Sequence, residues 1–200
     1  MNNIISTNGS SAYGIYLFTS SNSNISSNTI IINGSSGYGI YLNTGSNSNT
    51  LQSNTITTSN TNGWGIYLIS SSNSNISSNT ITTSGSTGYG IYFYSSSGNN
   101  ATNNKINATG TNADGVYIFS NSDNNILNLN NISKSGRDGI RVEGSTNERN
   151  NITANIILNS TGSGIFINNT KTASQLIQSN NISYSSNFSI LLSNASNITI

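Results

Sequence analysis

The chain contains no cysteine, no histidine and no proline, and charged residues make up only 6% of its 200 positions. The absence of cysteine excludes disulfides and redox chemistry through thiols. Without cysteine or histidine, and with methionine only at position 1, ordinary zinc, copper and iron sites lack their ligands. The absence of proline suits strands that are paired on both edges, because proline cannot donate to a strand ladder.

The charge balance bears on which macromolecules the chain can bind, and its two ends bear on whether it is part of a longer protein. With six basic and five acidic residues, the chain offers no basis for binding nucleic acid or an anionic membrane. No apolar run reaches membrane-spanning length, and the first residues lack the basic and apolar regions of a signal peptide. Solenoids need capped ends to stay soluble, and neither end offers a cap. We therefore expect residues 1–200 to be a single domain, a segment of a longer solenoid that is able to self-associate end to end.

What the chain does contain in quantity is serine, threonine and asparagine, about half of all residues, together with a repeated peptide. The peptide reads Gly-Ile-Tyr-Leu in its clearest copies and returns about every 25 residues. Its copies begin at Gly14, Gly39, Gly65, Gly90, Gly115, Gly139, Gly164 and, in degraded form, Ser189. A fixed period of this length indicates that each repeat is one coil of a solenoid, stacked on its neighbours.

Each repeat carries three short apolar segments. In the first repeat, Ile25 follows the Gly-Ile-Tyr-Leu peptide, and an Asn-x-Ile peptide begins three residues later at Asn28. All three segments are too short for a helix and alternate at a period of two, which is typical of strands. Three strands per coil predict an all-β fold, a parallel β-helix of about eight coils. The asparagines predicted to stack into a ladder of amides are Asn3, Asn28, Asn54, Asn79, Asn104, Asn130, Asn155 and Asn180.

Strand alternation assigns side chains to the inside or the outside of each coil. In the first copy of the repeated peptide, Ile15 and Leu17 point inward, which places Gly14, Tyr16 and Phe18 outside. By the same parity, the residue before each glycine lies on the inner side, and these residues are Tyr13, Tyr38, Trp64, Tyr89, Asp114, Asp138, Ser163 and Phe188. We expect the aromatic residues among them to wall a corner of the core, with their polar tips toward solvent.

Together, the Gly-Ile-Tyr-Leu peptide, the Ser/Asn-rich turn and the Asn-x-Ile peptide resemble the right-handed parallel β-helix repeat of the pectin-lyase-like superfamily, over essentially the whole chain. The resemblance implies a right-handed helix. It leaves the function open, because that superfamily includes polysaccharide lyases, glycoside hydrolases, copper-processing proteins and adhesin-like surface proteins. Regular repeats rich in Asn, Ser, Thr and Ile are most similar to the surface proteins. The missing His, Cys and internal Met ligands disfavour the copper-processing branch.

The outward positions include a column of aromatic residues at the same place in successive coils. The candidate ligand-binding residues are Tyr16, Tyr41, Tyr67, Tyr92 and Tyr117, with Tyr94 and Phe119 two residues further along their strands. The column continues at Phe166, after Arg141. Flat rings with hydroxyl groups suit stacking on a polysaccharide or a cell-surface glycan, or packing against a protein partner. The alternative is that the stacked tyrosines stabilise the coils and are shielded from solvent.

Charged residues concentrate in one short stretch. Seven of the eleven lie in it, namely Lys134, Arg137, Asp138, Arg141, Glu143, Glu148 and Arg149. Asp114 and Asp138 occupy equivalent positions in adjacent coils, and Arg141 and Glu143 point outward from one strand. In the lyase-like enzymes, such carboxylates do acid–base work or bind Ca²⁺, and an arginine neutralises substrate carboxylates. Asp114, Asp138, Arg141 and Glu143 are therefore the alternative catalytic centre, with Ca²⁺ as its one conceivable cofactor. The competing interpretation is a balanced salt-bridge network.

The sequence thus supports three functions. The first is a non-enzymatic stalk-like or adhesin-like segment, extracellular or on the cell surface, that presents the aromatic column to a glycan or a protein. The second is a polysaccharide lyase or glycoside hydrolase centred on the charged residues, which is disfavoured because few acids converge. The third is an ice-binding face, suggested by outward Thr55–Thr57 and Thr80–Thr82 but interrupted at Lys105, where ordinary strand propensity of threonine is the simpler explanation.

Overall fold

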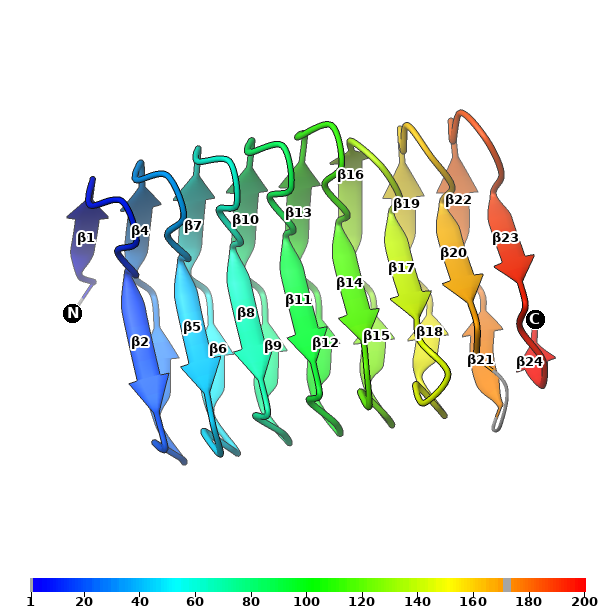
Figure 1. The fold of residues 1–200 in the computed structure, drawn as a ribbon, viewed down its shortest axis with the longest axis horizontal. Helices are drawn as coiled ribbons and strands as arrows, with labels where there is room; N and C mark the ends of the chain where they lie inside the picture. The colour runs from blue at the N-terminus through cyan, green and yellow to red at the C-terminus, as the bar shows by residue number, and fades with distance from the viewer. Residues whose placement is uncertain (1, 171–173) are drawn as a thin grey trace.

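The computed structural model describes residues 2–170 and 174–200, which form a rod of stacked coils (Figure 1). Each coil contributes one strand to each of three parallel sheets, here named A, B and C, and each sheet has eight strands. β1 lies at one end of the rod and β24 at the other (Figure 1). The predicted all-β solenoid of about eight coils is confirmed. Within the described ranges, no helix is long and apolar enough to cross a membrane.

The strands are short and nearly constant in length along the rod. Sheet A consists of β1 (Ile4–Thr7), β4 (Thr29–Ile32), β7 (Thr55–Thr58), β10 (Thr80–Thr83), β13 (Lys105–Ala108), β16 (Asn131–Ser135), β19 (Ile156–Leu158) and β22 (Asn181–Ser183). Sheet B consists of β2 (Ile15–Phe18), β5 (Ile40–Asn43), β8 (Ile66–Ile69), β11 (Ile91–Tyr94), β14 (Val116–Phe119), β17 (Ile140–Glu143), β20 (Ile165–Asn168) and β23 (Ile190–Ser193). Sheet C consists of β3 (Asn24–Ser26), β6 (Thr50–Gln52), β9 (Asn75–Ser77), β12 (Asn100–Thr102), β15 (Ile126–Asn128), β18 (Asn151–Thr153), β21 (Gln175–Gln178) and β24 (Ile198–Thr199).

Equivalent residues of successive coils lie directly above one another. In sheet B, Ile40 pairs with Ile66, and Ile66 pairs with Ile91. All three side chains are completely buried, as the alternation predicted. Because neighbouring coils stack in register, the inward columns of the three sheets merge into one continuous core that runs the length of the rod.

The predicted asparagine ladder is present at the turn between sheets C and A. Asn104, for example, donates from Nδ2 to Asn130 Oδ1 at 3.0 Å, and accepts from Asn79 Nδ2 at 3.0 Å. From Asn28 onward, the residue before each ladder asparagine has a positive φ, such as Asn103 at 57°. This tight turn brings the amide inward, where it satisfies backbone groups that burial would otherwise leave unpaired.

A second polar ladder at the start of sheet C was not predicted. Asn99 donates to Asn125 Oδ1 at 3.2 Å, and Asn125 donates to Asn150 Oδ1 at 3.1 Å. The backbone N–H of Asn150 donates to Gln175 Oε1 at 3.0 Å. All of these side chains are buried. The regular spacing of these asparagines is visible in the sequence, but Ser74 stands in place of an asparagine in one coil and obscures the column.

The corner that leads into sheet B departs from the prediction based on alternation. A Cβ added to Gly39 would lie 2.3 Å from Ile56 Cγ2 and 2.5 Å from the carbonyl oxygen of Gly65. The glycines of this column therefore face the interior, whereas we expected Gly14 to face outward. The position requires glycine because two coils and the core approach it closely.

The aromatic residues before these glycines lie outside the main core, so the expectation that they wall its corner is wrong. The polar residues of the same column, Asp114, Asp138 and Ser163, are buried. Trp64 packs on Tyr67 with ring centroids 4.5 Å apart, and Tyr89 packs on Tyr92 at 5.3 Å. The chain bends at the glycine, and alternation holds only within a strand. The aromatic residues of this row, which we call the flanking row, are Tyr13, Tyr38, Trp64 and Tyr89.

Candidate functional site

The outer face of sheet B carries a column of rings, the tyrosine stack, made of Tyr16, Tyr41, Tyr67, Tyr92 and Tyr117. Neighbouring ring centroids are 5.0 Å apart in every pair, with interplanar angles between 6° and 23°. Strands in a sheet are separated by about 4.8 Å. In-register pairing therefore brings the rings to stacking distance without any further adjustment.

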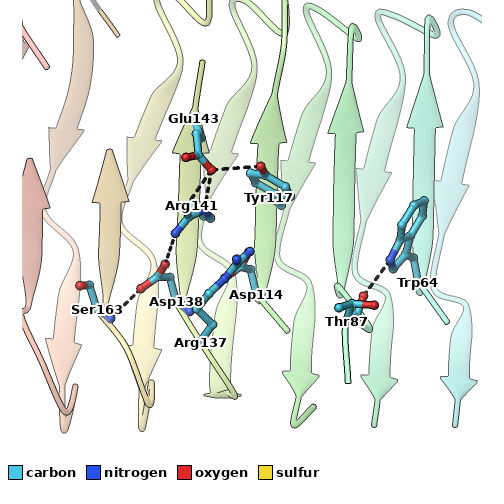
Figure 2. A network of polar contacts seen from close by, with 9 residues as sticks. All are labelled: Trp64, Thr87, Asp114, Tyr117, Arg137, Asp138, Arg141, Glu143 and Ser163. Atoms are coloured by element: carbon cyan, nitrogen blue, oxygen red, sulfur yellow. Dashed lines mark hydrogen bonds and ion pairs between the residues drawn. The ribbon is translucent and has the colours of Figure 1, made fainter. Parts of the chain in front are cut away.

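The flanking row closes one side of the tyrosine stack. Trp64 stacks on Tyr38 at 4.5 Å, with parallel rings, and meets Tyr67 and Tyr92 edge-on at 4.5 and 5.0 Å. Its Nε1 donates to the carbonyl oxygen of Thr87 at 2.8 Å (Figure 2). From Tyr38 and Tyr41 onward, the rings of the two rows belong to an apolar cluster separate from the main core.

This packing corrects the expectation of an exposed aromatic strip. The column points away from the main core, as predicted, but Tyr67, Tyr92 and Tyr117 are only 8–9% exposed. Each ring face is covered by the next ring in the stack. These three residues can offer a ligand their edges and hydroxyl groups, but not their faces.

Burial raises the pKa of several tyrosine hydroxyl groups in the flanking row and the tyrosine stack. It raises the pKa of Tyr38 to about 12, and it is the largest cause of the raised pKa values of Tyr67, Tyr92 and Tyr117. At any physiological pH the phenols therefore remain neutral hydrogen-bond donors.

A more accessible apolar row lies two residues further along the same strands. Ile69, Tyr94 and Phe119 are half-buried and pack against the tyrosine stack. The rings of Tyr94 and Phe119 are 5.7 Å apart and tilted by 45°. The tilt leaves part of each ring uncovered, so this row, which we call the open row, offers aromatic surface on sheet B to solvent.

Five charged residues, which we call the charged cluster, gather at the end of the tyrosine stack (Figure 2), namely Asp114, Arg137, Asp138, Arg141 and Glu143. Arg137 forms a two-point contact with Asp114, in which Nε donates to Oδ1 at 2.9 Å and Nη2 contacts Oδ2. The backbone N–H of Asp138 donates to Asp114 Oδ1 at 3.0 Å. The guanidinium of Arg137 lies 5.8 Å from the ring centroids of both Tyr89 and Tyr117.

Arg141 joins the other two acids. Its Nη1 donates to Asp138 Oδ2 at 2.9 Å, and its Nε donates to Glu143 Oε2 at 2.9 Å (Figure 2). Its guanidinium also lies 4.3 Å from the ring centroid of Phe166 and 6.0 Å from that of Tyr117. Arg141 therefore fills the position of a ring between Tyr117 and Phe166, so it extends the column through cation–π contacts instead of interrupting it.

The carboxylates of this cluster are saturated with hydrogen bonds. Besides Arg141, Glu143 accepts from the Tyr117 hydroxyl at 3.1 Å and from Asn168 Nδ2 at 3.0 Å. Asp138 Oδ1 accepts from the backbone N–H of Ser163 at 2.7 Å. With the contacts to Asp114, all six carboxylate oxygens of the three acids have a protein donor. The arrangement is the balanced network that was the alternative to a catalytic centre.

Neither Asp114 nor Glu143 provides an accessible acid or base with a pKa near neutrality. Burial raises the pKa of Asp114 to about 6, although Arg137 opposes the shift, but this side chain is fully buried. Partial burial alone would raise the pKa of Glu143, but the hydrogen bond from Asn168 and the charge of Arg141 outweigh it and lower that pKa. General acid–base catalysis works best when the pKa lies near the working pH.

The structure also locates the threonine pairs that suggested an ice-binding face. Thr55–Thr57 and Thr80–Thr82 lie side by side on the outer face of sheet A, where the array ends at Lys105 and Asn107. Over the ranges that the structure covers, no group of three or more His, Cys, Asp or Glu residues is placed to hold a metal ion.

Sequence reasoning brought together Asp114, Asp138, Arg141 and Glu143 but missed the partners that neutralise them. Arg137 reaches back one coil to Asp114, and Tyr117 bonds to Glu143 in the next coil. The in-register pairing of Tyr117 with Arg141 was implied by the repeat and is the signal that could have found these contacts.

Comparisons with known proteins agree with this architecture. Residues 57–200 match the family model described as a right handed beta helix region. A variant of the periplasmic alginate epimerase AlgG superposes with a TM-score of 0.72 at 20% identity, over 94% of this chain and 47% of that one. The unmodified epimerase gives 0.67 at 19% identity, over 94% and 48%. This chain thus spans about half the length of those structures, and the likeness shows the fold alone. No curated protein sequence matches the chain.

Proposed function

The chain belongs to the right handed beta helix family, and from that premise we propose that it is a non-catalytic rod segment that binds a polysaccharide along sheet B. The proposed contact surface is the open row, Ile69, Tyr94 and Phe119, next to the hydroxyl edges of the tyrosine stack. We further propose that the segment works outside the cell or on its surface. An alginate epimerase with a similar fold acts on a polysaccharide, which supports the ligand class.

One observation carries the non-catalytic part of this proposal. Every carboxylate oxygen in the charged cluster already accepts a hydrogen bond from the protein. A substrate would have to displace Arg141 or Arg137 from buried or half-buried contacts, which costs several kcal/mol for each broken pair. The cluster is better suited to anchoring one coil on the next than to turnover.

The binding part rests on the geometry of the rings. The open row is tilted and half-buried, so a sugar can approach the ring faces of Tyr94 and Phe119, as aromatic side chains at carbohydrate and protein interfaces do. The repeat places equivalent groups about 4.8 Å apart along the rod, so an extended chain would gain several weak contacts that add together.

Affinity electrophoresis in gels that contain neutral or acidic polysaccharides tests this proposal. We expect retardation of the wild-type chain by at least one polysaccharide, and its loss in a Tyr94→Ala/Phe119→Ala variant. Tyr184→Asn is the matched control, because Tyr184 is 82% exposed on a turn with a φ of 58°, a conformation that asparagine tolerates. No retardation of the wild type, or equal retardation of the pair, would show that this face does not bind.

A polysaccharide-active enzyme remains the second candidate, because one contact favours it. The Tyr117 hydroxyl donates to Glu143, and Arg141 lies beside both, which places a phenol, a carboxylate and a cation together on an outer face. The test is release of reducing ends or unsaturated products from acidic and neutral polysaccharides, with and without Ca²⁺. We expect none, and turnover that disappears in Asp138→Asn would replace the non-catalytic proposal with this one.

A further inference from the structure

The strands of sheet A carry lysine residues but no acidic residues, and the proposed function does not involve these lysines. All five acidic residues of the chain, Asp114, Asp123, Asp138, Glu143 and Glu148, lie outside the strands of this sheet. Lys105 and Lys134 lie on its neighbouring strands β13 and β16 and are exposed. Across the described residues, neither lysine forms an ion pair. The outer face of sheet A therefore carries two uncompensated positive charges.

A bulge sets the distance between these lysines. The register of β13 and β16 shifts after Ile106, so that Lys105 pairs with Asn131 but Asn107 pairs with Lys134. The extra residue in β16 is Ser133. Lys134 is thus a diagonal neighbour of Lys105, and diagonal neighbours on a sheet lie about 7–8 Å apart. Bulges re-aim side chains and often occur beside binding sites.

The bulge is bordered by two hollows. The larger has a volume of about 430 Å³ and is lined by Thr109, Lys134, Ser135, Gly136, Asn159 and Thr161. Its volume lies in the range of small-ligand sites.

The smaller hollow, of about 200 Å³, includes Thr80, Thr82, Lys105 and Asn107 in its lining. Each hollow therefore combines one lysine with hydroxyl and amide groups. A lysine ammonium group binds an anion, and hydroxyl and amide groups bind the hydroxyl groups of a ligand, so the lining suits a ligand that carries both acidic and hydroxyl groups.

The bulge also leaves hydrogen-bonding capacity unused. The side-chain oxygens of Asn107 and Asn131 are buried without a donor from the described part of the chain, and such atoms usually have a partner in a folded protein. The terminal torsion of asparagine is soft, so a modest rotation would bring either amide to a bound hydroxyl group. No comparable pair of lysines, hollows and unpaired amides occurs on the described outer face of sheet B.

We infer that the outer face of sheet A at the β13–β16 bulge binds an anionic oligosaccharide, with Lys105 and Lys134 each neutralising one acidic group and the two hollows receiving the sugar rings. This site is separate from the open row on sheet B. The acidic groups are carboxylates or phosphates, which share the charge and hydrogen-bonding chemistry that the lysines recognise. Because both lysines are solvated, the affinity depends strongly on ionic strength.

Titration calorimetry with the full chain tests the inference. The ligands are oligogalacturonate, a phosphorylated oligosaccharide and a neutral oligosaccharide of the same length, at low and at high salt. We expect at least one of the two anionic ligands to bind at low salt, the neutral one to bind at least tenfold more weakly, and a Lys105→Gln/Lys134→Gln variant to lose about tenfold in affinity. The ranking of the two anionic ligands identifies the preferred acidic group.

Arg149→Gln is the charge-matched control, since this exposed arginine lies away from sheet A, at the turn before β18. It should bind like the wild type, and so should Tyr94→Ala/Phe119→Ala, which separates this site from the proposed sheet B surface. Equal binding of neutral and anionic ligands, no binding of either anionic ligand, or an equal loss of affinity in Arg149→Gln would overturn the inference. Equal affinity for a highly sulfated dextran would do so as well, because it would indicate unspecific attraction of polyanions.

Discussion

Asn104 illustrates what one residue contributes to this rod. Its amide bonds to Asn130 in the next coil, to Asn79 in the previous one, and to the carbonyl oxygen of Ile76 at 2.8 Å. The side chain is 1% exposed. A single buried amide therefore links three consecutive coils and satisfies backbone and side-chain groups that water cannot reach.

Replacing Asn104 tests the energetic weight of this ladder. We expect Asn104→Ala to lower the free energy of unfolding by about 2–4 kcal/mol, because it leaves several buried polar groups without partners. Asn112→Ala, at an exposed position in the adjacent turn, should change it by less than about 0.5 kcal/mol. Urea denaturation measures both values. A small effect at Asn104 would mean that water replaces the amide.

The raised pKa of Asp114 predicts that the stability of the folded chain depends on pH. Its pKa rises from 3.8 in the unfolded chain to about 6 in the folded one, so the folded state binds the proton more tightly. The contribution of Asp114 to stability is therefore fully present below about pH 4 and is lost as the pH rises through 6.

Comparison of the wild type with Asp114→Asn isolates this contribution. We expect the free energy of unfolding of the wild type, relative to that of the variant, to fall by at most about 3 kcal/mol between pH 4 and 7. Glu143 acts in the opposite direction because its pKa is lowered, and it does so in both proteins. Parallel curves of stability against pH would show that Asp114 titrates normally.

At the scale of the element, each coil is shaped by its corner glycine. A Cβ at Gly90 would lie 2.4 Å from Ile106 Cγ2 and 2.5 Å from the carbonyl oxygen of Gly115. These neighbours belong to the core and to the next coil, so neither can move without disturbing the register. The corner is therefore where the repeat tolerates least variation.

Gly90→Ala should destabilise the chain by about 1–3 kcal/mol, as overpacking of a tight site does. Gly45→Asn is the contrasting variant, because Gly45 has a φ of 72° and a Cβ added there would meet open space, and asparagine accepts this conformation. Its effect should stay below about 1 kcal/mol. Thermal melts of both variants test this prediction, and equal melting temperatures would contradict the conclusion that the corner glycines face the interior.

At the scale of the whole molecule, stability is the sum of the coils and of the interfaces between them. The core column and the tyrosine stack run in parallel on the two sides of sheet B. Ile66 belongs to the first and Tyr67 to the second, one residue apart. Disruption of the core at one coil should therefore disorder the outer aromatic rows at the same coil.

Ile66→Asp tests this coupling, because an unpaired buried carboxylate costs several kcal/mol. We expect loss of the β-sheet signal in far-UV circular dichroism together with a change in the fluorescence of Trp64, the single tryptophan. Thr57→Asp, at an exposed position of β7, should leave both signals unchanged. A normal melt of Ile66→Asp would remove the inward assignment and every face that depends on it.

The sequence by itself determined the features that depend on strand pairing. Because coils stack in register, a period of about 25 residues places like residues above like, and this predicts the coil number, the inward isoleucines and the asparagine ladder. It also predicts that Asp114, Asp138, Arg141 and Glu143 meet, since they share neighbouring strands and corners.

Only the tertiary structure decided what depends on bends and side-chain torsions. Alternation cannot be carried across a corner, so the inward glycines and the outer position of Trp64 were missed. Alternation also does not show whether an outward ring is exposed to solvent or packs against the ring of the next coil. The side chains of Tyr67 and Tyr92 stack on each other, and Arg137 turns toward Asp114, because burying a ring face or pairing a charge is more favourable than leaving it in water.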